Sequence, residues 1–357
     1  MFFRRAGISH TRYRDERQIW PLPIDRYTVF LIAALLLAAP FLIDRLYVVS
    51  YLLPLIIWST AALGLNLLMG GAGQIHLGYG AVIGIGAYSS VHMLRAGVPF
   101  ELAMIGGGLA AAAIGSIFGA VAMRVKGLYL AMATLAMQYI VDFVIIQFPA
   151  ISGGTQASLP VPPTSFLGFP VEGDRVPYYV ALVICGIVTL FMLNVRRTAF
   201  GRALAAVREK DYAAAIIGVD PFRFKLLAFW VSSFIGGLTG AVLSVCYYRT
   251  IAPEQFHLDL SIQLVAMVIV GGLGSVLGVF FGVALILFAP ILLNQAVALL
   301  ADQFGMNLPM DLRAHLPLML YGGLIMGFLL IEPLGLAKIR NNIRNYFLVW
   351  PFRHSRQ

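Results

Sequence analysis

Residues 261–300 read SIQLVAMVIVGGLGSVLGVFFGVALILFAPILLNQAVALL, a run without a charged side chain. A membrane-spanning helix needs about 20 apolar residues, so this run is too long for one span. The segment Gly271-Gly272-Leu273-Gly274-Ser275 interrupts it and predicts a tight turn between two helices. Apolar residues make up 60% of the 357 positions and charged residues 11%, whereas soluble domains are about 25% charged. The sequence therefore predicts an all-α, polytopic membrane protein.

The rest of the chain supplies further apolar runs of spanning length, which bring the expected number of transmembrane helices to about ten. A basic N-terminal segment (1–26) and a basic tail (333–357) flank a membrane domain predicted over 27–332. Its longest connections are 149–177 and 196–225. The other predicted spans are 27–43, 47–69, 77–94, 100–123, 128–148, 178–195, 226–248 and 315–331.

The net charge of +9 indicates how the chain is oriented in the membrane rather than nucleic-acid binding. Eighteen of the 25 Lys and Arg residues lie before Tyr27, between Arg196 and Lys225, or after Pro333. No basic and aromatic nucleic-acid module accompanies them. Ten alternating spans with both termini cytoplasmic put all three clusters on the cytoplasmic side of a bacterial inner membrane, as the excess of positive charge inside requires. Five arginines are then expected outside: Arg45, Arg95, Arg175, Arg249 and Arg313.

The sequence contains no signature of an ATP site or another catalytic centre. A phosphate-binding loop needs a Gly-Lys pair, and none of the four lysines follows a glycine. Motifs for zinc proteases, serine hydrolases and Cys–His metal sites are also missing. We therefore predict no catalytic residue, no metal site and no cofactor in this chain.

The segment 198–225 carries the most specific local information. Its alanines and leucine favour a helix through about Ile217, with Gly218 as the C-terminal stop and Asp220-Pro221 opening the next helix. Small and charged side chains on this helix suit either an interfacial helix on anionic lipid or a docking surface for a partner protein.

A resemblance to a known family favours docking. Tyr212-Ala213-Ala214-x-x-x-Gly218 resembles the coupling-loop core of ABC-importer permeases, with Tyr where the family has Glu. The flanking Gly201-Arg202-Ala203-Leu204 is similar to the LivM-type permease of branched-chain amino acid importers. So are Gly78-Tyr79-Gly80-Ala81 and Val270-Gly271-Gly272-Leu273-Gly274-Ser275. The resemblance implies that the following residues couple the chain to an ATPase: Gly201, Arg202, Arg208, Ala213, Ala214 and Gly218.

This family implies a type II importer fold and a multi-subunit machine. The expected partners are a LivH-type permease, two ABC ATPase subunits that bind ATP and Mg, and a periplasmic substrate-binding protein. Membrane lipid surrounds the chain, and an amino acid is its cargo. ATP hydrolysis is thus expected in a separate subunit.

Glycines dominate one membrane segment, with eight between Gly64 and Gly86. They allow close helix packing, and the Gly70–Gly73 cluster also permits a broken helix, which membranes tolerate only where it is buried in protein or lines a cavity. A second cluster, Gly271 to Gly282, hints at repeated halves. Polar or glycine positions at membrane depth are candidates for the translocation path or for hydrogen bonds between helices and, for Asp142, an interfacial position: Asn66, Gln74, Gly78, Gln138, Asp142 and Gly272.

Two alternatives stay open. The same machinery could import urea, short amides or aromatic acids, because the binding protein selects the cargo. A secondary transporter driven by an ion gradient is a different class. It should carry paired carboxylates inside the membrane, whereas Asp142 is the one acid expected well within a span.

Overall fold

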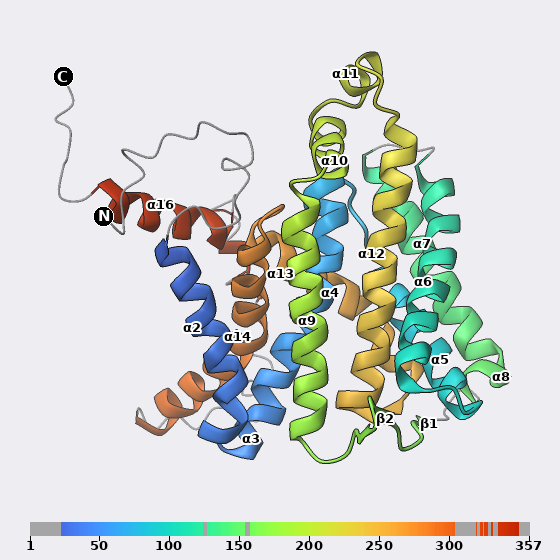
Figure 1. Ribbon diagram of the computed structural model, residues 1–357, viewed down its shortest axis with the longest axis vertical. Coiled ribbons are helices and arrows are strands. Elements are labelled where there is room, and N and C mark those ends of the chain that lie inside the picture. Colours follow the sequence, from blue (N-terminus) through green and yellow to red (C-terminus); the bar gives the residue numbers. More distant parts are fainter. Residues whose placement is uncertain are drawn as a thin grey trace.

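The computed structural model describes residues 23–123, 127–153, 158–303 and 335–349, with a few more positions between 319 and 330. Most helices run side by side along one direction (Figure 1). Apolar segments fold this way because a helix satisfies its own backbone hydrogen bonds, as lipid requires. The all-α prediction is confirmed.

The described elements include short π-helical turns (η1, η2, η3) and one 3₁₀ turn (η4). Two antiparallel pairs, β1 with β4 and β2 with β3, are the strands of the described residues. In chain order the elements are α2 (Pro23–Leu42), α3 (Arg45–Tyr47), η1 (Val48–Leu52), α4 (Leu53–Asn66), η2 (Leu67–Gly71), α5 (Tyr79–Arg95), α6 (Phe100–Ala122), α7 (Leu128–Gln147), α8 (Pro149–Ser152), β1 (Leu159–Pro160), β2 (Ser165–Phe166), β3 (Phe169–Pro170), α9 (Arg175–Val195), α10 (Ala199–Glu209), α11 (Asp211–Ile216), α12 (Pro221–Leu243), η3 (Ser244–Tyr248), β4 (Thr250–Ile251), η4 (Pro253–Phe256), α13 (Leu258–Gly271), α14 (Val276–Gln303) and α16 (Leu336–Val349).

The long apolar helices agree with the predicted spans. α5 and α13 are shorter, with 17 and 14 residues, and the span predicted at 315–331 lies largely outside the described residues. The forty-residue run is split as expected, since α13 ends at Gly271 and α14 begins at Val276. Among the described residues, six segments are long and apolar enough to cross a membrane: Arg45–Gly71, Phe100–Ala122, Tyr129–Gln147, Arg175–Val195, Pro221–Tyr248 and Val276–Ala296.

Glycines bring α5, α6 and α12 into close contact at the centre of the bundle. A Cβ on Gly86 would lie 2.3 Å from the Cα of Gly237, and a Cβ on Gly240 would lie 2.0 Å from the carbonyl oxygen of Ile83. Backbones at this distance exclude any side chain at these positions. The prediction of close helix packing through glycine is therefore confirmed.

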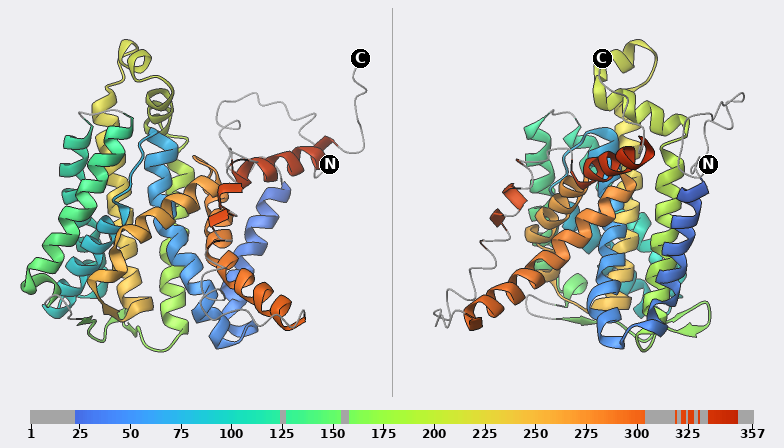
Figure 2. Two further views of the ribbon diagram at one scale, coloured as in Figure 1. Left: turned by 180° about the vertical axis from the view of Figure 1, so that it is seen from behind. Right: turned by 90° about the vertical axis from the view of Figure 1, so that its left-hand side faces the viewer.

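Two of the long helices end in the same way. α4 ends in the π-helical turn η2, and residues 73–78 then run without helix to α5. α12 ends in the π-helical turn η3, and residues 249–257 lead through β4 and η4 to α13. α4 finishes beside α10, whereas α12 starts just after α11, so the two helices run in opposite directions (Figures 1 and 2). Two helices that are interrupted in the same way and run in opposite directions are typical of the inverted repeats of transporters.

The break after Gly70–Gly73 agrees with the sequence prediction. The second glycine cluster packs α13 against α14, because a Cβ on Gly282 would lie 2.1 Å from the carbonyl oxygen of Met267. The segment in which α12 ends and the chain leads to α13, residues 244–257, contains no glycine.

Four of the five arginines expected outside lie at the end of the bundle opposite α10 and α11, and the fifth, Arg313, lies outside the described residues. Arg95 donates to the carbonyl of Pro160 (3.2 Å), Arg249 donates to the carbonyl of Gly173 (2.7 Å), and Arg45 pairs with Asp174. The described parts of the 149–177 connection, including β1 and β2, lie at this end (Figure 1).

Candidate functional site

Residues 196–220 connect α9 to α12 and contain α10 and α11. This segment, the α10–α11 loop, projects beyond the ends of the spans (Figure 1). Its capping agrees with the sequence: Gly218 adopts φ +87°, and the Asp220 side chain accepts from the backbone N–H groups of Phe222 and Arg223. The predicted continuous helix is wrong, however. Lys210 adopts an extended conformation (φ −152°, ψ 99°) and separates α10 from α11, so the chain turns between them.

The predicted coupling residues occupy different environments in this loop. Gly201 packs against the end of α9, since a Cβ there would lie 2.3 Å from the carbonyl oxygen of Val195. Arg202 and Ala213 are exposed, whereas Ala214 is buried and supports the loop from inside. Asp211 accepts from Lys225 at 2.6 Å, which ties α11 to α12.

The exposed tip of the loop is bulky rather than small. Tyr212, Ile216 and Ile217 have relative exposures of 82%, 71% and 73%. The sequence prediction of a docking surface made of alanines missed them, because a six-residue helix has no periodicity that shows which face is covered. Three large apolar side chains on a projecting loop are typical of a protein contact.

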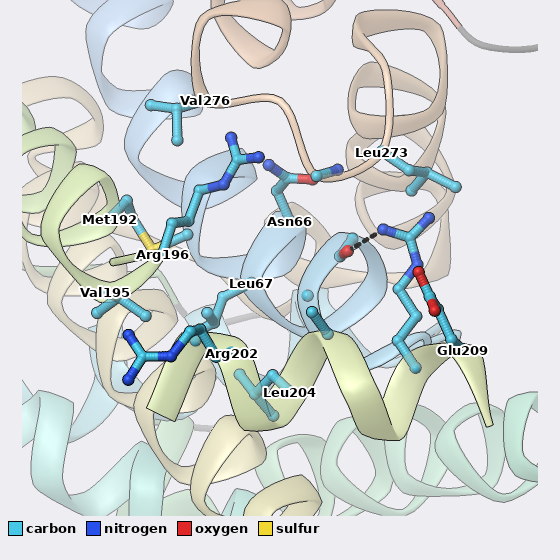
Figure 3. A pocket seen from close by; sticks show the side chains of 16 residues that line it. Asn66, Leu67, Met192, Val195, Arg196, Arg202, Leu204, Glu209, Leu273 and Val276 are labelled. Carbon is cyan, nitrogen blue, oxygen red and sulfur yellow. Dashed lines mark hydrogen bonds between the residues drawn. The ribbon is translucent and has the colours of Figure 1, made fainter. Parts of the chain in front are cut away.

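A pocket of about 520 Å³ lies between α10, the end of α4 and the α13–α14 turn (Figure 3). Arg208 of α10 donates to the carbonyl of Gly70, drawn as a dashed line in Figure 3. Asn66 accepts from the N–H of Gly274 (2.8 Å) and donates to the carbonyl of Ser275 (3.3 Å). The projecting loop, η2 and the turn are therefore held together by direct polar contacts.

The six candidate path residues divide among three places. Asn66 and Gly272 belong to the turn region just described, and Gln74 lines an adjacent pocket with Asp211 and Tyr212. The remaining three, Gly78, Gln138 and Asp142, come together at mid-depth, where the two irregular segments meet. The structure therefore brings together only half of the predicted set at a site inside the bundle.

Gln138 of α7 is the hub of this mid-depth junction. Its Oε1 accepts from the N–H of Ala81 (2.8 Å) and from the hydroxyl of Ser261 (2.9 Å). Its Nε2 donates to the carbonyl of Phe256 (2.8 Å) and to Asp142 (3.0 Å). The fully buried side-chain amide of Gln138 thus joins the starts of α5 and α13, the helices that follow the two irregular segments.

Neighbouring contacts complete the junction. The N–H of Gly80 donates to the hydroxyl of Ser261 (2.7 Å), and the N–H of Leu77 donates to the hydroxyl of Thr134 (3.0 Å). Gly78 has no room for a side chain, because a Cβ would lie 2.4 Å from the carbonyl oxygen of Thr134. The backbone groups released by the broken helix are therefore taken up by side chains, as lipid requires.

A half-buried carboxylate borders the junction. Asp142 lies 3.4 Å from the Nδ1 of His257, which precedes α13. Sequence reasoning named Asp142 and Gln138 but missed His257, Ser261 and Thr134. The stretch RTIAPEQFH (249–257), polar and proline-containing between apolar runs, is the signal that could have marked the second break.

The chain matches a known family over most of its length. A family model described as "Branched-chain amino acid transport system / permease component" matches residues 47–331. The chain belongs to this permease family. The match covers both broken helices and the α10–α11 loop, so the permease carries the described features within its family domain.

Curated relatives agree. The high-affinity branched-chain amino acid transport system permease protein LivM of Escherichia coli K12 is 31% identical over 293 residues, covering 74% of this permease and 68% of that protein. A probable LivM of Methanocaldococcus jannaschii is 27% identical over 226 residues, covering 62% of this chain and 64% of its own. The D-allose permease AlsC of E. coli is 25% identical over 265 residues (73% and 75%). No solved structure matches the chain.

Proposed function

We propose that this permease is one of two membrane subunits of an ATP-driven importer of branched-chain or other hydrophobic amino acids. A second, LivH-type permease completes the path, two ATPase subunits bind ATP and Mg, and a periplasmic protein delivers the substrate. The LivM relatives, whose names state branched-chain amino acid transport, support this cargo. The D-allose relative shows that related permeases serve other cargo, so urea, short amides and aromatic acids remain the alternative.

The observation that carries the proposal is the α10–α11 loop with its exposed apolar tip. Tyr212, Ile216 and Ile217 offer a surface for a partner, and Arg208 joins the same loop to Gly70, which lies just before the irregular segment 73–78. A force on the tip is therefore transmitted through Arg208 and Gly70 to the irregular segment that ends at the mid-depth junction. Coupling requires such a contiguous connection to an element with two arrangements.

The charge distribution gives the orientation that coupling needs. Basic residues of 196–225 lie at the α10–α11 end, whereas Arg45, Arg95, Arg175 and Arg249 lie at the other. From the positive-inside rule we expect the α10–α11 end, and both termini, in the cytoplasm, where ATP is available. The end at which the described parts of 149–177 lie faces the delivering protein.

The secondary-transporter alternative finds less support. An ion-driven carrier should hold paired acids inside the membrane, and Asp142 instead contacts an amide, Gln138, and a histidine, His257.

A matched pair of glycine substitutions tests the coupling surface. Gly218 and Gly97 have φ +87° and +82°, and a Cβ on either meets nothing within 4 Å. A β-branched residue is strained at such a φ by about 1–3 kcal/mol. We expect Gly218→Val to abolish uptake and the co-purification of ATPase with tagged permease, and Gly97→Val, at the opposite end, to leave both intact.

Both variants should insert into the membrane in normal amounts. If Gly218→Val transports and retains ATPase like the unmodified permease, the docking role of the α10–α11 loop is wrong. Equal loss in both variants would trace the effect to backbone strain and would also refute the docking role.

A further inference from the structure

α16 lies across the α10–α11 end of the bundle, roughly perpendicular to the spans, and extends sideways from the central helices (Figures 1 and 2). With 14 residues it is too short to cross a membrane. Its start is fixed tightly: a Cβ on Gly335 would lie 2.5 Å from the Cα of Gly272, and a Cβ on Gly278 would lie 2.9 Å from the Cβ of Ala337. α16 is therefore a rigid extension of the α13–α14 turn.

Beyond this fixed start, α16 is amphipathic. Ile339, Ile343 and Tyr346 follow one another at helical spacing and have relative exposures of 36%, 55% and 59%. Such a stripe is the form of a helix that lies in the plane of a membrane interface. The spans beside it end at the same level, which places the stripe at the depth where acyl chains meet headgroups.

The charges of α16 select the kind of lipid. The helix contains Lys338, Arg340 and Arg344 and no acidic residue, and Arg353 and Arg356 follow it. In the sequence, Arg340 and Arg344 directly follow Ile339 and Ile343, two residues of the apolar stripe. Each basic residue at a membrane surface favours anionic lipid by roughly fivefold in partitioning.

We propose that α16 is an interfacial helix that docks on anionic phospholipid headgroups and holds the α13–α14 turn in place through them. The turn is the one that Asn66 binds through Gly274, and it contacts η2, to which Arg208 is bonded. The lipid composition of the leaflet thus acts on the contacts of the α10–α11 loop. This reading of α16 does not depend on the cargo or the ATPase.

A single-cysteine probe tests the docking directly. Cys185 and Cys246 are buried, so a fluorophore on Ile343→Cys reports α16 in the full-length permease. The labelled protein is placed in nanodiscs of phosphatidylcholine, or with about a quarter phosphatidylglycerol, each carrying brominated acyl chains that quench on contact. We expect stronger quenching when phosphatidylglycerol is present.

Two triple variants distinguish the effect of positive charge from the effect of the particular basic side chains. Lys338→Gln with Arg340→Gln and Arg344→Gln should lose the extra quenching, whereas Lys338→Arg with Arg340→Lys and Arg344→Lys should retain it. Phosphatidylglycerol should likewise raise the melting temperature of the unmodified protein and of the variant that keeps its positive charges, but not of the Gln variant.

Two results would overturn the proposal. Absence of quenching in both lipids would mean that protein or water covers the stripe. Equal quenching in the two lipids would mean that α16 does not distinguish anionic headgroups.

Discussion

Gly240→Val should prevent the permease from assembling its central three-helix contact. The new Cβ would begin 2.0 Å from the carbonyl oxygen of Ile83 and 2.8 Å from the N–H nitrogen of Ala87, both backbone atoms of α5. No rotamer relieves a clash with backbone, so α12 must move away from α5. Overpacking of this kind costs about 3 kcal/mol or more. We expect little folded protein in the membrane, measured by gel-filtration yield and thermal unfolding in detergent.

Gly186→Val is the matched control. Gly186 also lies in the middle of a spanning helix, α9, but a Cβ there meets nothing within 4 Å. The same substitution should therefore leave yield and melting temperature near those of the unmodified permease. A folded Gly240→Val protein with an unchanged melting temperature would contradict the packing of α5 on α12.

Gln138→Leu should abolish uptake while allowing the chain to insert. Leucine fills a similar volume but leaves the N–H of Ala81 and the carbonyl of Phe256 buried without the Gln138 partner. An unsatisfied buried group costs about 1–3 kcal/mol, so the junction between α5 and α13 should lose roughly 2–6 kcal/mol. The measurement is substrate uptake at matched expression, together with the melting temperature.

Gln147→Leu provides the comparison on the same helix. Gln147 lies exposed at the end of α7, so this substitution should change neither uptake nor melting temperature appreciably. Gln138→Glu keeps the acceptor for Ala81 and Ser261 but loses the donor to Phe256, and we expect an intermediate defect. Normal uptake by Gln138→Leu would show that the hub does not link the two broken helices.

Features set by local chemistry were predictable from the sequence. A glycine beyond the last helical residue, as at Gly218, and an Asp-Pro pair at a helix start, as at Asp220, act through their own backbone. The turn at Gly272 to Ser275 was likewise marked by its glycines, two of which adopt positive φ.

Features that depend on tertiary contact were not predictable. Gln138 and Ser261 are 123 residues apart, and nothing near either residue indicates the other. The burial of Ala214 and the exposure of Tyr212 follow from the way α11 packs against α12. The sequence of a six-residue helix does not show which of its faces will be covered. Lys210 breaks a stretch of good helix formers, and the next residue, Asp211, pairs with Lys225, a contact made only in the folded protein.

We propose that ATP hydrolysis by partners docked on the α10–α11 loop drives import. The most direct measurement is uptake of a branched-chain amino acid into proteoliposomes that contain the permease pair and the ATPases, with binding protein outside. We predict uptake that requires ATP on the α10–α11 side and persists when ionophores collapse all ion gradients. Uptake without ATP that follows an imposed ion gradient would contradict the account.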